Sequence, residues 1–153
     1  MADDRGAVFF ADIDNEYVQM IIVLSCYELS DFENDQYANE AILSTDGGAS
    51  FDRILKVPLK TTDAANLHIH DVEYDPYVDR IWVVVGDSDN SQMYWSDDLG
   101  TSWETIADQD EVTMLTQIAA FKDCVAFGTD GEPEGINRWT NCYAYSEQNR
   151  WYF

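Results

Sequence analysis

The sequence predicts an all-β protein made of three successive four-stranded antiparallel units. Short β-rich runs alternate with Gly, Asp, Asn and Ser residues, and no segment has the period of an amphipathic helix. One eight-residue pattern also occurs twice, beginning at Ser44 and at Ser96. At 153 residues the chain suits one domain with one sizeable core.

The units are expected at about residues 1–60, 61–110 and 111–153, within a single domain spanning 1–153. Their strands are expected to follow the same order in each unit. The runs that predict them are 7–13, 20–24 and 40–43 in the first unit, 69–74, 80–85, 92–95 and 103–106 in the second, and 115–121, 124–127, 136–140 and 142–153 in the third.

The second strand of each unit is continuously apolar, as in Ile21–Leu24, Ile81–Val85 and Cys124–Phe127. A continuous apolar strand has both faces covered, whereas an alternating strand has one face in water. Four-stranded units with such inner strands suit the blades of a β-propeller, which stack face to face around an axis. A β-sandwich is the second alternative, and it would favour mostly alternating strands.

The two copies of the eight-residue pattern read Ser-x-Asp-x-Gly-x-Ser-aromatic, and the third unit has no copy. The pattern closely resembles the Asp box, or BNR repeat, of sialidase-like β-propellers, where it joins the third and fourth strands of a blade. The resemblance implies structural roles: the Asp accepts hydrogen bonds from turn amides, the Gly supplies a positive φ, and the aromatic ring covers the hairpin. The matching residues are Ser44, Asp46, Gly48, Ser50 and Phe51, then Ser96, Asp98, Gly100, Ser102 and Trp103.

Three blades make a partial propeller, because closed propellers typically have about 4–8 blades. We expect closure either by homo-oligomerisation, for example of two chains, or because the chain is part of a longer one. The aromatic segment Trp151–Phe153 is expected to be covered by a neighbouring subunit.

Thirty acidic residues against eight Lys and Arg give a net charge of −22, which excludes phosphate backbones as partners. A domain this anionic repels itself at low ionic strength, and molar salt shortens the screening length to about 3 Å. The carboxylates are spread along the whole chain, which favours a protein of a halophile over an ordinary acidic surface. We therefore expect the fold to weaken when salt is diluted.

No catalytic residue, cofactor or metal site is predicted. The five arginines (Arg5, Arg53, Arg80, Arg138 and Arg150) do not match the arginine signature that the sialidase resemblance would require. His68 and His70 share one face of an extended run, but two ligands are fewer than a metal site needs, so a packed pair is favoured. Cys26, Cys124 and Cys142 are expected to be buried thiols, with a Cys124–Cys142 bridge as the alternative. Aromatic residues of the third unit favour core or interface positions over sugar stacking: Trp139, Tyr143, Tyr145, Trp151 and Tyr152.

These features predict a non-catalytic structural or glycan-binding component of an extracellular assembly, with a virion of a halophilic archaeon as the leading setting. The partners would be further copies, neighbouring subunits of a particle, or cell-surface glycans. The chain start has no signal-peptide pattern, and the longest apolar run, Met20–Leu24, is too short to span a bilayer. A glycoside hydrolase fragment and a cytoplasmic scaffold remain the alternatives.

Overall fold

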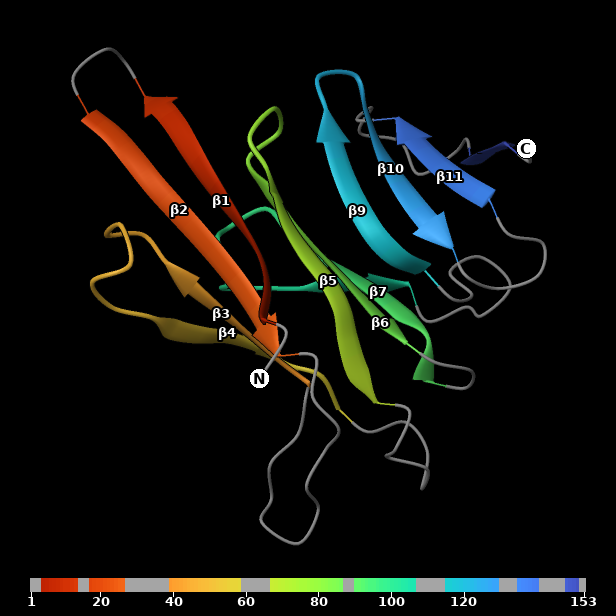
Figure 1. Cartoon of the computed structure of the whole chain (residues 1–153), viewed down its shortest axis with the longest axis horizontal. Coiled ribbons are helices and arrows are strands. Elements are labelled where there is room, and N and C mark those ends of the chain that lie inside the picture. The colour runs from red at the N-terminus through yellow and green to blue at the C-terminus, as the bar shows by residue number, and fades with distance from the viewer. Residues whose placement is uncertain are drawn as a thin grey trace, which may run out of the picture.

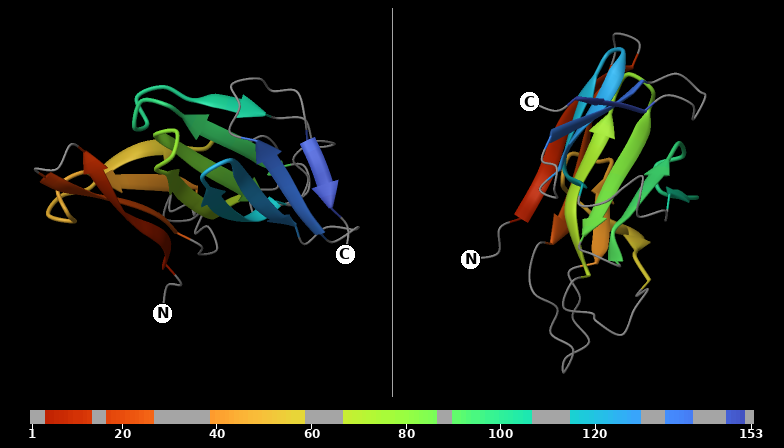
Figure 2. Two further views of the ribbon diagram at one scale, coloured as in Figure 1. Left: turned by 90° about the horizontal axis from the view of Figure 1, so that it is seen from above. Right: turned by 90° about the vertical axis from the view of Figure 1, so that its right-hand side faces the viewer.

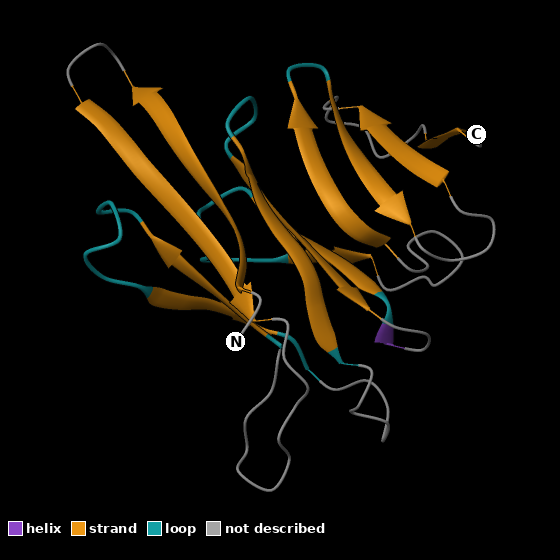
Figure 3. Ribbon diagram, viewed as in Figure 1, coloured by secondary structure: helices purple, strands orange, loops and turns teal. Residues whose placement is uncertain are grey.

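The computed structural model describes residues 4–13, 17–26, 39–58, 67–86, 90–106, 115–129, 135–140 and 148–151. These residues form twelve strands and contain no α-helix, so the all-β prediction is confirmed. The strands make three antiparallel sheets of four strands each, which lie one beside the next in Figure 1. Figure 3, coloured by secondary structure, shows the same predominance of strand.

Each sheet is a simple meander in which sequence neighbours pair, and each lies within one of the three expected units. The strand positions agree closely with the sequence-based expectations. Sheet 1 comprises β1 (Asp4–Ile13), β2 (Tyr17–Cys26), β3 (Glu40–Ser44) and β4 (Asp52–Lys56); sheet 2 comprises β5 (His68–Asp75), β6 (Arg80–Gly86), β7 (Gln92–Ser96) and β8 (Glu104–Ile106); sheet 3 comprises β9 (Leu115–Phe121), β10 (Cys124–Thr129), β11 (Gly135–Thr140) and β12 (Gln148–Trp151).

Strand β6 lies at the centre of the core, because its side chains are buried on both sides of sheet 2. Ile81, Val83 and Val85 pack in one cluster with sheet 1, whereas Trp82 and Val84 pack in another with sheet 3. All five side chains are nearly inaccessible to solvent. The interpretation of a continuous apolar run as a strand covered on both faces is therefore confirmed for β6. In β2 the same expectation is wrong within the described residues, because Ile22 and Leu24 are only partly buried and no described sheet packs on their side.

Sheet 1 packs on sheet 2 in the same orientation in which sheet 2 packs on sheet 3. We call the face of a sheet that meets the following sheet its front face and the opposite face its back face. The front face of sheet 1, with Val23 and Leu43, covers the back face of sheet 2. The front face of sheet 2, with Trp82 and Met93, covers Val125 and other back-face residues of sheet 3.

Two views in Figure 2 show this three-layer succession from above and from the side. A two-layer sandwich, the second sequence-based alternative, does not describe it. The described strands form open sheets, and no closed barrel or ring is present among them.

A β-bulge in β5 ties sheet 2 to sheet 3 through two consecutive polar side chains. The register with β6 shifts between Ile69 and Asp71, which leaves His70 as the extra residue. The Nδ1 of His70 donates to the carbonyl oxygen of Leu115 (2.7 Å), and Asp71 accepts from the amide of Ile118 at its Oδ2 (2.9 Å). In a regular strand these neighbours would point to opposite faces.

Substituting Gly86 tests this junction. A Cβ at Gly86 would lie 2.1 Å from the imidazole of His70, which is held by its bond to β9. Gly86→Ala should therefore displace His70 and destabilise the protein by about 1–3 kcal/mol, the range for overpacked sites. Thermal melting in molar salt measures the effect.

Gly128→Ala provides the matched control, because Gly128 lies near the end of β10 as Gly86 lies at the end of β6. Its added Cβ would come no closer than 3.5 Å to a neighbouring atom. Equal losses of stability in the two variants would contradict the role given to the contact between Gly86 and His70.

Candidate functional site

The first octapeptide forms the hairpin between β3 and β4 and is closed by its own side chains. Ser44 Oγ donates to Asp46 Oδ1 (2.8 Å) and accepts from the amide of Gly48 (2.8 Å). The carboxylate of Asp46 also accepts from the amide (2.9 Å) and the hydroxyl (2.6 Å) of Ser50. Two side chains, those of Ser44 and Asp46, thus satisfy turn amides that no strand pairing could reach.

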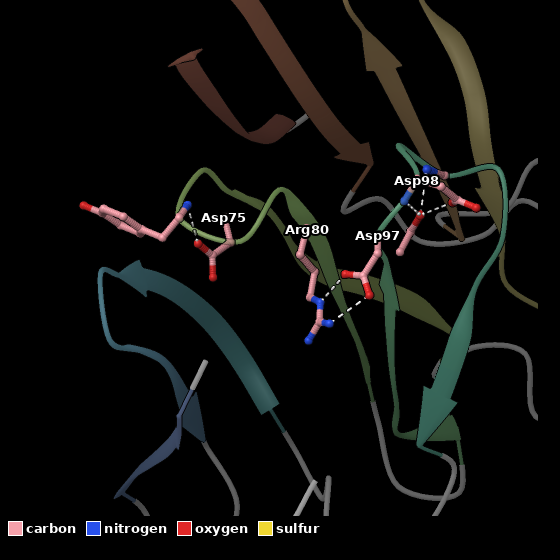
Figure 4. A network of polar contacts seen from close by, with 7 residues as sticks. Asp75, Arg80, Asp97 and Asp98 are labelled. Atoms are coloured by element: carbon pink, nitrogen blue, oxygen red, sulfur yellow. Dashed lines mark hydrogen bonds and ion pairs between the residues drawn. The ribbon is translucent and has the colours of Figure 1, made fainter. Parts of the chain in front are cut away.

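The second octapeptide repeats this network between β7 and β8 with nearly the same distances. Ser96 Oγ donates to Asp98 Oδ1 (2.8 Å) and accepts from the amide of Gly100 (2.8 Å). Asp98 accepts from the amide (2.8 Å) and the hydroxyl (2.6 Å) of Ser102. Figure 4 shows Asp98 with hydrogen bonds of this network as dashed lines. The same set of side-chain hydrogen bonds therefore closes both hairpins.

Two consecutive left-handed residues turn the backbone in each copy. They are Gly47 and Gly48 in the first, with φ of 75° and 89°, and Leu99 and Gly100 in the second, with φ of 54° and 87°. Gly100 is constrained twice, because a Cβ there would lie 2.5 Å from the Cβ of Ile54 in β4. The second hairpin thus lies directly against the outer strand of sheet 1.

The aromatic residues that end the two copies have different surroundings. Trp103 packs against the core between sheets 1 and 2, and its Nε1 donates to the carbonyl of Ile54 (2.9 Å) and of Gly100 (3.1 Å). Phe51, at the equivalent position of sheet 1, is 41% exposed. The difference arises because sheet 2 has a described neighbour on its back face and sheet 1 has none.

Hydrogen bonds hold the carboxylates of both octapeptides, Asp46 and Asp98, in the ionised state. The bond from the Ser50 hydroxyl, followed by that from the Ser50 amide, lowers the pKa of Asp46 far below its usual value. The corresponding bonds from Ser102 lower the pKa of Asp98. Groups with this environment are acceptors at any ordinary pH and cannot donate a proton to a substrate.

A second acidic group lies on β5, where Asp71, Glu73 and Asp75 alternate on the front face of sheet 2. Burial, followed by repulsion from Asp71 and Asp75, raises the pKa of Glu73 to about 8. Burial also raises the pKa of Asp75, against the opposing effect of its bond from the Tyr77 amide (3.0 Å). This group is not among the sequence-based predictions, although Asp-x-Glu-x-Asp in a strand places three carboxylates on one face.

Arg80 lies beside this group and has its own partners. Its guanidinium forms two bonds to the carboxylate of Asp97, at 2.5 Å and 2.9 Å, and lies over the rings of Trp82 and Trp95. Figure 4 shows Asp75, Arg80 and Asp97 along one side of the sheet. Arg80 is therefore held within sheet 2 by a fork-shaped ion pair and two cation–π contacts.

The remaining candidate residues have structural surroundings or fall outside the described ranges. His68 and His70 lie with ring centroids 4.6 Å apart, and no group of three His, Cys, Asp or Glu in the described ranges could hold a metal ion. Arg53 pairs with Glu40 (2.9 Å), and Cys124 is a buried free thiol, so the Cys124–Cys142 bridge is not formed. Positions whose side chains lie outside the described residues are Arg5, Cys26, Arg138, Trp139, Cys142, Tyr143, Tyr145, Arg150, Trp151, Tyr152 and Phe153.

Comparisons with known proteins add no family assignment. No family model matches the chain, and neither the curated proteins nor the solved structures contain a match. The interpretation of the site therefore rests on its geometry.

Replacing Asp98 tests whether the carboxylate closes the hairpin. Asp98→Ala removes the acceptor for Ser96 and Ser102, so the melting temperature in molar salt should fall by several degrees. Asp52→Ala, an exposed carboxylate on β4, removes the same charge and should change it little. Equal melting temperatures for the two variants would contradict the structural role of Asp98.

Replacing Glu73 tests the acidic group on β5. Between pH 4.5, its ordinary pKa, and about 8, the folded protein binds a proton that the unfolded chain has released. Stability should therefore fall as the pH rises through this window, and Glu73→Gln should remove that part of the dependence. Because water still reaches the side chain, we expect a gain on the order of 1 kcal/mol above pH 8.

Melting temperatures at pH 5 and pH 8.5 in molar salt measure this difference. Glu104→Gln, on β8, controls for the loss of one negative charge. A raised pKa of Glu73 is contradicted if both substitutions raise the melting temperature equally at both pH values.

Proposed function

We propose that this chain is a non-catalytic segment of an Asp-box β-propeller, acting as a structural or host-surface-binding component of an extracellular assembly. The observation that carries the proposal is the repetition of one hydrogen-bonded hairpin at the same point of two stacked sheets. In both sheets it joins the third strand to the fourth. The two networks agree in donors, acceptors and left-handed positions.

The stacking of the sheets supports the assignment of each sheet as a blade. Four-stranded meanders that stack front to back, with inner strands buried on both faces, are the units of propellers. Strand β5 lies between the other two sheets, since it contacts β1 and β2 of sheet 1 on one side and β9 of sheet 3 on the other. Contact between the first strands of successive sheets is what the innermost strands of blades make around a propeller axis.

The state of the charged groups supports a non-catalytic role. The box carboxylates are occupied by turn donors, and Arg53 and Arg80 are paired with Glu40 and Asp97. Each guanidinium group therefore already has a carboxylate partner within the chain. The chain would then contribute shape and surface, and its target would be a glycan or a protein of the host envelope.

The charge supports an assembly that works in high salt. A net charge of −22 is tolerated by a compact protein when molar salt screens the repulsion. A virion of a halophile fits this condition and an extracellular position. No described segment is a helix long and apolar enough to cross a membrane.

Glycoside hydrolysis is the second candidate function, and Glu73 is the observation that favours it. A carboxyl group with a pKa of about 8 beside other carboxyl groups resembles the acid of a glycosidase pair. Tight packing of this face against sheet 3 argues against access by a substrate, because Asp71 on the same face is bonded to Ile118.

Binding and turnover should be measured on the same glycans in molar salt. We expect retention on envelope glycans or glycoproteins of halophilic cells, with no release of sugar by the wild type. Release of sugar that Glu73→Gln abolishes would establish the hydrolase instead. Absence of both binding and turnover, together with recovery of intracellular partners, would favour a cytoplasmic scaffold.

A further inference from the structure

The back face of sheet 1 differs from the back faces of the other two sheets, because no described segment covers it. Its residues can be matched to sheet 2 through the strand register. Ile22 pairs with Ser44 as Ile81 pairs with Ser96, so these two positions are equivalent. By the same register, Leu24 corresponds to Val83 and Ile42 to Tyr94.

The equivalent residues differ in exposure. Ile81, Val83 and Tyr94 are buried under the front face of sheet 1. Ile22, Leu24 and Ile42 are only partly buried, although they are as apolar.

Phe51 supplies an independent sign that a layer is missing here. Its counterpart Trp103 is covered by β4 of the preceding sheet, where it donates to Ile54. Phe51 is 41% exposed at the corresponding place on sheet 1. Together with Ile22, Leu24 and Ile42 it forms an apolar surface, which we call the sheet 1 docking face.

The complementary surface lies at the other end of the stack. On sheet 3, Val125 and Phe127 face sheet 2, so Ala126 and its cross-strand partner Ala119 lie on the front face. Phe121, which pairs with Cys124 on the same face, is 50% exposed. This sheet 3 docking face is formed by Ala119, Phe121 and Ala126.

We propose that the sheet 1 docking face of one chain packs on the sheet 3 docking face of a second copy, so that two chains close a ring of six sheets. The inference rests on the proposed propeller and identifies its partner. The contact would repeat the front-to-back stacking that already occurs twice within the chain. One chain carries both faces, so the contact is head-to-tail, and six blades lie within the range of about 4–8 for closed propellers.

Sedimentation in molar salt tests the contact, with one added carboxylate in each variant. Leu24→Asp alters the sheet 1 docking face and Phe121→Asp the sheet 3 docking face. Tyr77→Asp adds the same charge at a 54% exposed aromatic residue in the turn after β5, outside both faces. We expect dimers for the wild type and Tyr77→Asp, and folded monomers for the other two variants.

Mixing the two monomeric variants makes the test specific for head-to-tail docking. A Leu24→Asp chain keeps an intact sheet 3 face, and a Phe121→Asp chain keeps an intact sheet 1 face. One unaltered junction can then form, so an equimolar mixture should recover dimers. A contact formed by the same patch on both chains would not be restored in this way.

Circular dichroism checks that each variant is folded, and Leu24→Ser replaces Leu24→Asp if the carboxylate disrupts sheet 1. The proposal is overturned by a wild-type monomer, by an extended polymer, by dimers that survive both substitutions, or by a mixture that stays monomeric. A monomer that still binds envelope glycans would overturn the docking alone and leave the proposed function standing.

Discussion

Burial of β6 on both faces is the constraint on which the other sheets depend. Its alternate side chains enter two separate clusters, so sheet 2 cannot be covered by a single partner layer. Because burial of apolar surface is the main favourable term in folding, neither sheet 1 nor sheet 3 can be removed without exposing half of this strand. The chain is consequently a stack of layers whose stability resides between the sheets.

Most of the strand order could be predicted from the sequence, because the patterns that mark strands and hairpins are local. Continuous apolar runs end at Gly86 and near Gly128, and repeated Ser, Asp and Gly residues specify hairpins within eight positions. The bulge at His70 could not be predicted in this way. Its position depends on the carbonyl of Leu115, 45 residues further along the chain.

The same limit applies to the candidate sites. The internal contacts of the octapeptides could be predicted, because donors and acceptors lie within four residues of one another. The contact of Trp103 with Ile54 could not, because it requires the placement of sheet 2 on sheet 1. The raised pKa of Glu73 likewise depends on burial between layers, which a strand pattern does not specify.

The hairpin networks also bear on how the chain reaches its fold. Every bond around Asp46 and Asp98 joins residues no more than four positions apart, so closing these loops costs little chain entropy. Hairpins of this kind form in about 1–10 μs, long before distant strands meet. The two octapeptides can therefore act as early nuclei that fix the pairing of β3 with β4 and of β7 with β8. Sheet 3 has no copy of the octapeptide, and its strands would gain their order later, by docking on a sheet 2 that is already formed.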